Sequence, residues 1–278
     1  MRRLLSISLA LCLMFACATF ASAEVGGTDA EVNPGMIYTP ENPAHPYIDV
    51  PGTYEPSWSS GVNSTHQFIT GNAINLVKSA VSSYPLTSYT STLKTKSDAP
   101  DSSLESVGHG ENDNGLFLGH FYDPDTGKTW DGSTAPTAKS RLVNHYQTAV
   151  SRYKAGNITA AMESLGFALH YAADLSTPHH AANVTAGLTG NHAQYEKWVR
   201  DNQSKYAATT LSSSTLTWAR NTSVSNMGHN FAVNAKAQIN NAKVEATFAT
   251  AASNTLPKAQ RNCAAILYKF LIDVGAIK

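Results

Sequence analysis

The sequence predicts an all-α fold, organised as a single compact multi-helix domain. After Asn157, apolar residues recur at the three- and four-residue intervals of one helix face, at Ile158, Ala161, Met162, Leu165, Ala168 and Leu169. Between residues 170 and 196, two histidines are followed four residues later by a carboxylate, a spacing that places both side chains one turn apart on the same face of a helix. Both observations are typical of helices that pack against one another.

The expected helices succeed one another along the chain from about residue 62. Helical patterns cover residues 61 to about 82, 136–154, a segment that starts near 157, 230–251 and 257–275. The segment 98–132 is rich in Gly, Asp and Ser and is expected to be a long irregular loop. Because loops of that length in a compact domain are usually functional, this segment is a candidate part of the site.

The N-terminus has the pattern of a secretory signal peptide. Arg2 and Arg3 precede an apolar stretch, and Ala21-Ser22-Ala23 is a cleavage site before Glu24. No later run of 18 apolar residues is present. We therefore expect the protein to be secreted, to the extracellular space or the periplasm.

The sequence is expected to divide into three segments. Residues 1–23 form the signal peptide, and residues 24–57 form an extended proline-rich segment that is either a pro-peptide or an arm. Residues 58–278 form the helical domain. Of the three cysteines only Cys263 lies in that domain, within an apolar helical pattern, which favours a small core residue over a nucleophile.

The charge balance excludes one class of partner. The 278-residue chain has 20 Lys and Arg against 20 Asp and Glu, so its formal net charge is zero. A protein that binds duplex nucleic acid commonly needs a basic surface to neutralise phosphates. The charge therefore gives no support for duplex nucleic acid as a partner, and the favoured interpretation below includes no nucleic acid.

A dense set of possible metal ligands lies between residues 170 and 196. The two helical pairs are His170/Asp174 and His192/Glu196, and His180 lies between them just after a proline that should end the first helix. Imidazoles and carboxylates are ligands that Zn²⁺ prefers. A single such residue is usually structural, but charges placed in the apolar run F-A-L-H-Y-A-A-D-L are costly to bury unless something compensates them.

A further histidine precedes a turn in the predicted loop. His120 begins the segment H-F-Y-D-P-D-T-G-K-T, in which D-P-D-T-G is a turn signature. The Gly-Lys-Thr is not a phosphate-binding loop, because Tyr122 stands where that motif requires a glycine and no strand precedes it.

Four motifs together resemble the bacterial zinc-dependent phospholipases C, the group that includes the clostridial alpha-toxin. They are H-F-Y-D-P-D-T-G-K-T at 120–129, L-H-Y-A-A-D at 169–174, P-H-H-A-A-N at 178–183 and H-A-Q-Y-E at 192–196. The resemblance covers residues 58–278 and is to the catalytic domain, without the C-terminal membrane-binding domain of the toxins. It implies the all-α fold shared by zinc-dependent phospholipases C and single-strand nucleases.

The resemblance also implies a site with three Zn²⁺ ions. Trp58 matches the mature N-terminal residue, whose α-amino group binds one ion together with His66. Asp174 matches the carboxylate shared with a second ion, which His120, His170 and a loop Asp complete. The third ion is held by His180, His192 and Glu196.

The loop Asp is expected to be Asp113, five residues after Gly108, with Glu111 as the alternative and His109 as a possible additional ligand. The resemblance favours a role as general base for this residue. Phe117 matches a substrate-binding aromatic residue of the phosphatidylcholine-cleaving members. Their acidic and second aromatic residues are replaced here by Gly61 and Asn114, which puts a preference for choline in doubt.

The expected function is therefore hydrolysis of the glycerol-side phosphodiester bond of phospholipids to diacylglycerol and a phosphorylated head group. Clustered zinc ions would neutralise the charge that develops on the phosphoryl group. The enzyme is expected to act as a monomer at a membrane or micelle surface. Two alternatives are a secreted single-strand nuclease of the same fold and an inactive zinc-binding surface protein. The short interval from His180 to His192 and the final Glu196 favour the phospholipase over the nuclease.

Overall fold

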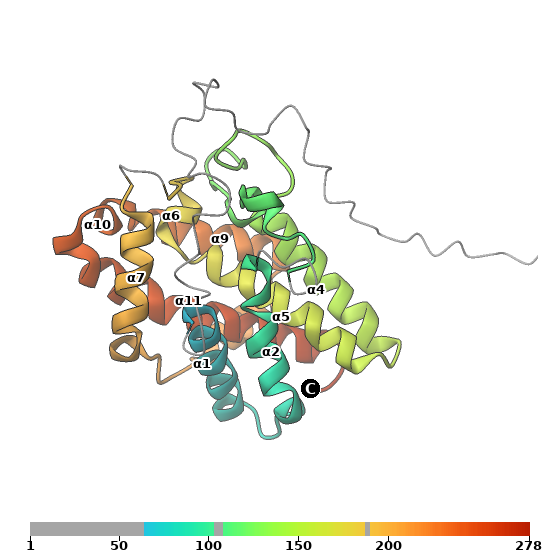
Figure 1. The fold of residues 1–278 in the computed structure, drawn as a ribbon. Helices are drawn as coiled ribbons and strands as arrows, with labels where there is room; N and C mark the ends of the chain where they lie inside the picture. Colours follow the sequence, from blue (N-terminus) through green and yellow to red (C-terminus); the bar gives the residue numbers. More distant parts are fainter. Residues whose placement is uncertain (1–63, 103–107, 187–189) are drawn as a thin grey trace, which may run out of the picture.

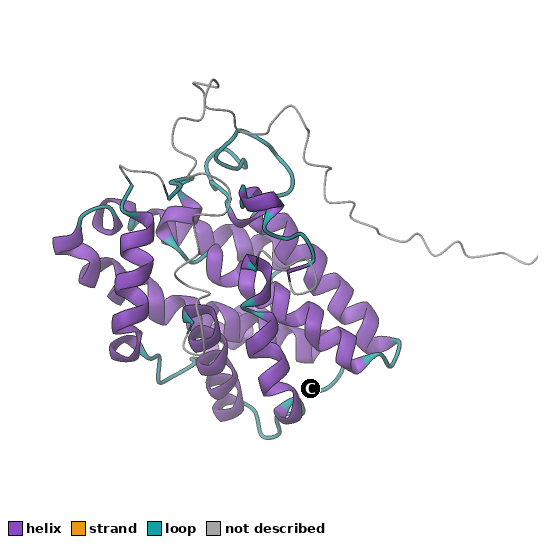
Figure 2. Ribbon diagram, in the orientation of Figure 1, coloured by secondary structure: helices purple, strands orange, loops and turns teal. Residues whose placement is uncertain are grey.

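The computed structural model describes residues 64–102, 108–186 and 190–278. Regular structure in these ranges is helical, apart from one isolated β-bridge between Asp123 and Lys128 (Figure 2). The all-α prediction is therefore confirmed. The α-helices are α1 (Thr65–Ala80), α2 (Thr90–Lys96), α4 (Ala138–Lys154), α5 (Ile158–Asp174), α6 (Pro178–Ala181), α7 (His192–Asn202), α8 (Ser213–Asn221), α9 (Val224–Lys236), α10 (Ile239–Ala242) and α11 (Phe248–Asp273).

Short 3₁₀ turns link several of these helices. They are η2 (Thr87–Tyr89), η3 (Ala99–Asp101), η4 (Asp113–Gly115), η5 (Leu118–His120), η6 (Gln203–Tyr206) and η7 (Glu245–Thr247). Three of them, η3, η4 and η5, lie in the segment 98–132 that was predicted to be irregular. None of the helices in the described ranges is both long and apolar enough to cross a membrane.

Helix α5 forms the centre of the bundle. It packs against α2, α4 and α11, and α1 lies along α11 (Figure 1). The side chains of the segment from Ser164 to Asp174 are all buried, in agreement with the apolar run in the sequence. A helix that is buried on nearly every side holds its polar residues away from water. This is why His170 and Asp174, at the end of α5, lie inside the protein.

Local sequence explains where several helices begin. The side chains of Ser64, Thr137, Ser212 and Ser223 each accept a hydrogen bond from a backbone N–H of the first turn, at α1, α4, α8 and α9. At α4 the cap is reciprocal, because the Ser140 hydroxyl accepts from the backbone N–H of Thr137.

The prediction of one helix over residues 230–251 is wrong. The chain instead leaves α9 at Lys236 and makes two short turns before α11 begins at Phe248. The Thr247 hydroxyl donates to the carbonyls of Asn241 and Val244, which holds the turn between these elements. A side-chain hydroxyl that competes for backbone carbonyls in this way favours a turn over a continuous helix.

The start predicted for the last helix, at Pro257, is also wrong, because α11 passes through that proline. Proline in a helix interior removes one backbone hydrogen bond and costs ~3 kcal/mol. Buried residues lie on both sides of it, including Leu256 and Ala259, and their packing offsets that cost. Cys263 is buried within α11, and burial raises the pKa of its thiol, as expected for a core residue.

The contact between α2 and α5 depends on a glycine. A Cβ built on Gly166 would lie 2.5 Å from the Cβ of Lys96 and 3.2 Å from the carbonyl oxygen of Leu93. Alanine is a better helix former than glycine by ~1 kcal/mol, but forcing two helices apart costs ~1–3 kcal/mol. We expect Gly166→Ala to lower the free energy of unfolding, measured by urea denaturation.

Gly71 in α1 offers the matched control. A Cβ there would meet only the flexible end of Lys94, at 3.7 Å. Gly71→Ala should therefore stabilise the protein by up to ~1 kcal/mol. Equal effects of the two substitutions would contradict the role of Gly166 in the close approach of α2 and α5.

Candidate metal centre

Side chains from six elements converge beside the C-terminal end of α5. They are His66 from α1, Asp101 from η3, His120 from η5, His170 and Asp174 from α5, His180 from α6, and His192 and Glu196 from α7. All are buried, with relative exposures between 0% and 9%. Buried charges need a partner or a cation, so this collection indicates a metal centre.

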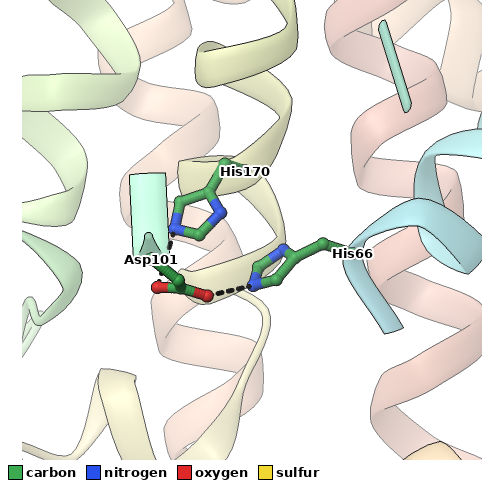
Figure 3. Close-up of side chains that lie close together, drawn as sticks. All are labelled: His66, Asp101 and His170. Carbon is green, nitrogen blue, oxygen red and sulfur yellow. Dashed lines mark ion pairs between the residues drawn. The ribbon is translucent and has the colours of Figure 1, made fainter. Parts of the chain in front are cut away.

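The first group consists of His66, Asp101 and His170 (Figure 3). The Asp101 carboxylate lies between the two histidines: its Oδ2 is 3.6 Å from His66 Nε2 and its Oδ1 is 3.6 Å from His170 Nε2. The two imidazoles are stacked with their centroids 4.1 Å apart.

The second group consists of His120, His170 and Asp174. His120 Nδ1 lies 3.0 Å from His170 Nε2, and Asp174 Oδ2 lies 3.0 and 3.1 Å from these two nitrogens. Asp101 Oδ1 is 3.2 Å from His120 Nδ1. Two ligands of one tetrahedral zinc are roughly 3.3 Å apart, so these spacings suit a shared ion.

Asp174 links the two groups. While its Oδ2 faces His120 and His170, its Oδ1 lies 3.5 Å from His66 Nε2 and 4.0 Å from His180 Nδ1. A carboxylate whose two oxygens face different sets of nitrogens has the arrangement of a bridging ligand.

The third group consists of His180, His192 and Glu196. Glu196 Oε1 is 2.8 Å from His192 Nε2, one turn earlier in α7, and 3.3 Å from His180 Nε2. The i, i+4 pair predicted from the sequence therefore faces one point, and α6 brings the second histidine to it.

Backbone carbonyls orient three of the histidines. His170 Nδ1 donates to the carbonyl of Ser97 at 3.0 Å, and His180 Nδ1 donates to the carbonyl of His120 at 2.8 Å. His120 Nε2 donates to the carbonyl of Glu111 at 2.9 Å. Since a carbonyl only accepts, each of these nitrogens carries a hydrogen, and the opposite nitrogen faces the cluster. Such hydrogen bonds are the usual outer support of metal-binding histidines.

The histidines and carboxylates of the cluster shift one another's pKa values in opposite directions. Burial alone would lower the pKa values of His170 and His180, but nearby carboxylates, Asp174 above all, raise both to about 9. Burial alone would raise the pKa of Asp174, yet the charges of the two histidines hold it well below its usual range. In the metal-free protein these histidines therefore hold protons at neutral pH, and a metal ion would displace them. Imidazole nitrogens and carboxylate oxygens are donors that fit Zn²⁺.

Comparison with known proteins agrees with this donor set. A family model described as zinc dependent phospholipase C matches residues 65–244, the part that contains every residue of the cluster. The chain belongs to the zinc dependent phospholipase C family. The resemblance inferred from the four motifs is thereby confirmed.

Individual relatives of this zinc dependent phospholipase C family member are longer. The phospholipase C of Paraclostridium bifermentans is 31% identical over 175 residues, which are 60% of this chain and 42% of that protein. The phospholipase C of Clostridium haemolyticum is 27% identical over 250 residues, 79% of this chain and 61% of that protein. The chain thus spans less than two thirds of the length of either relative.

A solved structure shows the same fold. The alpha toxin of Clostridium absonum superposes with a TM-score of 0.68 at 24% identity, over 81% of this chain and 67% of that chain. The match supports the single helical bundle.

Seven of the nine predicted metal ligands are brought together by the fold of this family member. They are His66, His120, His170, Asp174, His180, His192 and Glu196. Trp58 lies outside the described residues, so its role as a ligand stays a prediction. Phe117 is half-buried, and its ring is 5.3 Å from that of His120, close to the cluster.

Asp113 was predicted to be a metal ligand, but its side chain contacts other groups. Its Oδ1 lies 2.5 Å from the Nη2 of Arg141, and its Oδ2 accepts from the backbone N–H of Gly119 at 2.7 Å. The side chain of the alternative, Glu111, also faces Arg141 and accepts a hydrogen bond from Tyr171. A carboxylate paired with a buried guanidinium is already neutralised, so neither residue joins the three groups.

Asp101 lies against the histidines of the cluster, where Asp113 was expected. Five acidic residues lie between positions 98 and 113, and spacing from a single glycine gave no reliable choice among them. The deciding feature is helix α2, which was not predicted. It is followed by the 3₁₀ turn η3, which contains Pro100 and carries Asp101 against His66 and His170.

Proposed function

We propose that this protein is a zinc-dependent phosphodiesterase that cleaves phospholipids as a phospholipase C. The observation that carries the proposal is the presence of three adjoining groups of buried nitrogen and carboxylate donors, within the part of the chain that matches the family. Phospholipases C are also the proteins to which the chain is similar.

We assign the donors to three Zn²⁺ ions. His66 and Asp174 would bind one ion together with the α-amino group of Trp58. Asp101, His120, His170 and Asp174 would bind the second, and His180, His192 and Glu196 the third. When bound, zinc ions stabilise the negative charge that a phosphodiester gains on attack and make a water molecule more acidic.

Residues of the chain would position the ions and the attacking water. Asp174 lies between the first two groups and would hold the two ions at a fixed separation. Asp101 would take the general-base role that the resemblance attaches to the loop Asp, because its carboxylate lies beside His120 within the cluster and would there accept a proton from the attacking water. Backbone carbonyls keep His120, His170 and His180 aimed inward.

We propose that the enzyme accepts phospholipids with head groups other than choline. With Asp101 as the loop Asp, the following residue is Ser102; with Asp113 it would be Asn114. Neither residue is aromatic. Phe117 can still meet an ammonium group by a cation–π contact worth ~1 kcal/mol. We therefore propose that the enzyme cleaves phosphatidylethanolamine as well as phosphatidylcholine.

We also propose that the N-terminal part of the chain is removed in two steps. Residues 1–23 would direct secretion and be removed, and removal of residues 24–57 would expose the α-amino group of Trp58. An amide nitrogen is a poor metal ligand because its lone pair is delocalised into the carbonyl, whereas an α-amino group is a good one. Activity would then require cleavage before Trp58.

Product analysis tests the proposed function. The zinc-loaded protein, beginning at Trp58, is incubated with mixed micelles of phosphatidylcholine, with micelles of phosphatidylethanolamine and with single-stranded DNA. We expect diacylglycerol and a phosphorylated head group from the lipids and no shortened DNA. Cleavage of DNA alone would establish the nuclease alternative, and no product from any substrate would establish an inactive zinc-binding protein.

A further inference from the structure

Arg141 is a buried cation beside the metal centre, and it pairs with Glu111 and Asp113, which are not among the ligands proposed above. It lies in the first half of α4, and only 2% of its side chain is exposed. A buried guanidinium must be neutralised and hydrogen-bonded to be tolerated. Its partners are therefore a guide to what it does.

The guanidinium forms ion pairs with two acidic residues of the segment that precedes His120. Its Nη2 is 2.5 Å from Asp113 Oδ1, and its Nε is 3.2 Å from Glu111 Oε2. The remaining Nη1 donates to the backbone carbonyl of Glu111. Burial alone would raise the pKa of Glu111, but the hydrogen bond from His145 and the charge of Arg141 lower it to about 2, so this carboxylate is ionised.

The carbonyl of Glu111 connects Arg141 to the metal centre. The same oxygen that accepts from Arg141 also accepts from His120 Nε2, at 2.9 Å. That hydrogen bond fixes which ring nitrogen carries the hydrogen and leaves Nδ1 facing Asp101, His170 and Asp174.

The segment from Gly108 to His120 needs such support. His109, Asp113, Asn114 and Phe117 all have positive φ, between 51° and 57°, a conformation that residues other than glycine disfavour. The backbone also passes directly over the guanidinium, since a Cβ on Gly119 would lie 2.4 Å from Arg141 Cζ. The segment is therefore shaped around this one side chain.

We propose that Arg141 is a positioning residue that holds His120 in place as a ligand and thereby sets the metal affinity of the group formed by Asp101, His120, His170 and Asp174. The inference rests on the proposed function, because it takes these residues as zinc ligands. It predicts that loss of the guanidinium weakens the ion bound through the His120 side chain most, since the ligands of the third group come from α6 and α7.

Metal binding alone provides the test. Zinc retained per chain is measured across a series of chelator-buffered zinc concentrations for Arg141→Lys and Arg141→Met. Removal of an outer partner of a ligand commonly weakens metal binding by ~10–100-fold, and we expect a loss of this size for one ion in both variants. Arg152, which bonds Ser164 from the same helix α4, supplies the matched controls Arg152→Lys and Arg152→Met, which should bind zinc as the unmodified protein does.

The absorption spectrum of the Co²⁺-loaded protein distinguishes positioning from general stability. The spectrum of Arg141→Lys should differ from that of the unmodified protein. In a His120→Ala background the Arg141 substitutions should cause no further loss of zinc, because the residue through which they act is gone.

Three results would overturn the inference: zinc affinity unchanged in both Arg141 variants, equal weakening of all ions, or failure of even Arg141→Lys to fold. If the unmodified protein itself binds no zinc, the proposed function fails instead, which separates the two outcomes.

Discussion

Replacing Asp174 with asparagine should lower phosphodiesterase activity at least ~100-fold, because metal ions contribute several kcal/mol to stabilising the transition state and each 1.36 kcal/mol is a factor of ten. The substitution keeps the size of the side chain but removes the charge that lies between two groups of ligands. We therefore expect the zinc content to fall as well. Initial rates on phospholipid micelles and metal analysis of the same sample measure both effects.

Asp201→Asn is the matched control, because Asp201 is an exposed carboxylate on α7 that pairs with Lys197 and Arg200, away from the cluster. Its rate and zinc content should equal those of the unmodified protein. A rate for Asp174→Asn within a factor of two or three of that control would reject Asp174 as a bridging ligand.

Removing the metal should destabilise the whole domain. Three carboxylates and five histidines are buried in the cluster, and without a cation their charges are compensated only by one another. A ligand present at 1,000 times its dissociation constant stabilises the folded state by ~4 kcal/mol. For a domain of this size that corresponds to a fall in Tm of about 10 °C when the metal is withdrawn.

Thermal unfolding followed by circular dichroism, before and after dialysis against a chelator, measures this change. Adding zinc back should restore both Tm and activity, whereas adding Mg²⁺ should restore neither, because Mg²⁺ prefers oxygen ligands and keeps several waters. A chelated protein with unchanged Tm and full activity would show that the cluster is not a metal centre.

Most of the fold could be predicted where one helix face is continuously apolar. Helices α1, α4 and α5 were predicted from that pattern, to within a few residues at α1 and α4. The errors arose where tertiary packing outweighed local signals, as at Pro257, which lies inside α11, and where a side-chain hydroxyl holds a turn, as at Thr247. Neither effect is visible in the spacing of apolar residues.

Most of the site could likewise be predicted, because helices fix the spacing of their ligands. The i, i+4 pairs of α5 and α7 face single points, as the sequence indicates. Asp101 was missed because its position depends on an unpredicted helix and turn. Asp113 was expected in the cluster, but it pairs with the buried Arg141, and nothing in the sequence reveals that pairing.

Metal analysis of the purified protein tests the central claim most directly. A sample that begins at Trp58 is equilibrated with zinc, freed of loosely bound metal by gel filtration and measured by elemental mass spectrometry. The account predicts close to three Zn²⁺ per chain, and a lower number in Asp174→Asn. A protein that retains no zinc would contradict the assignment of these buried histidines and carboxylates as a metal centre.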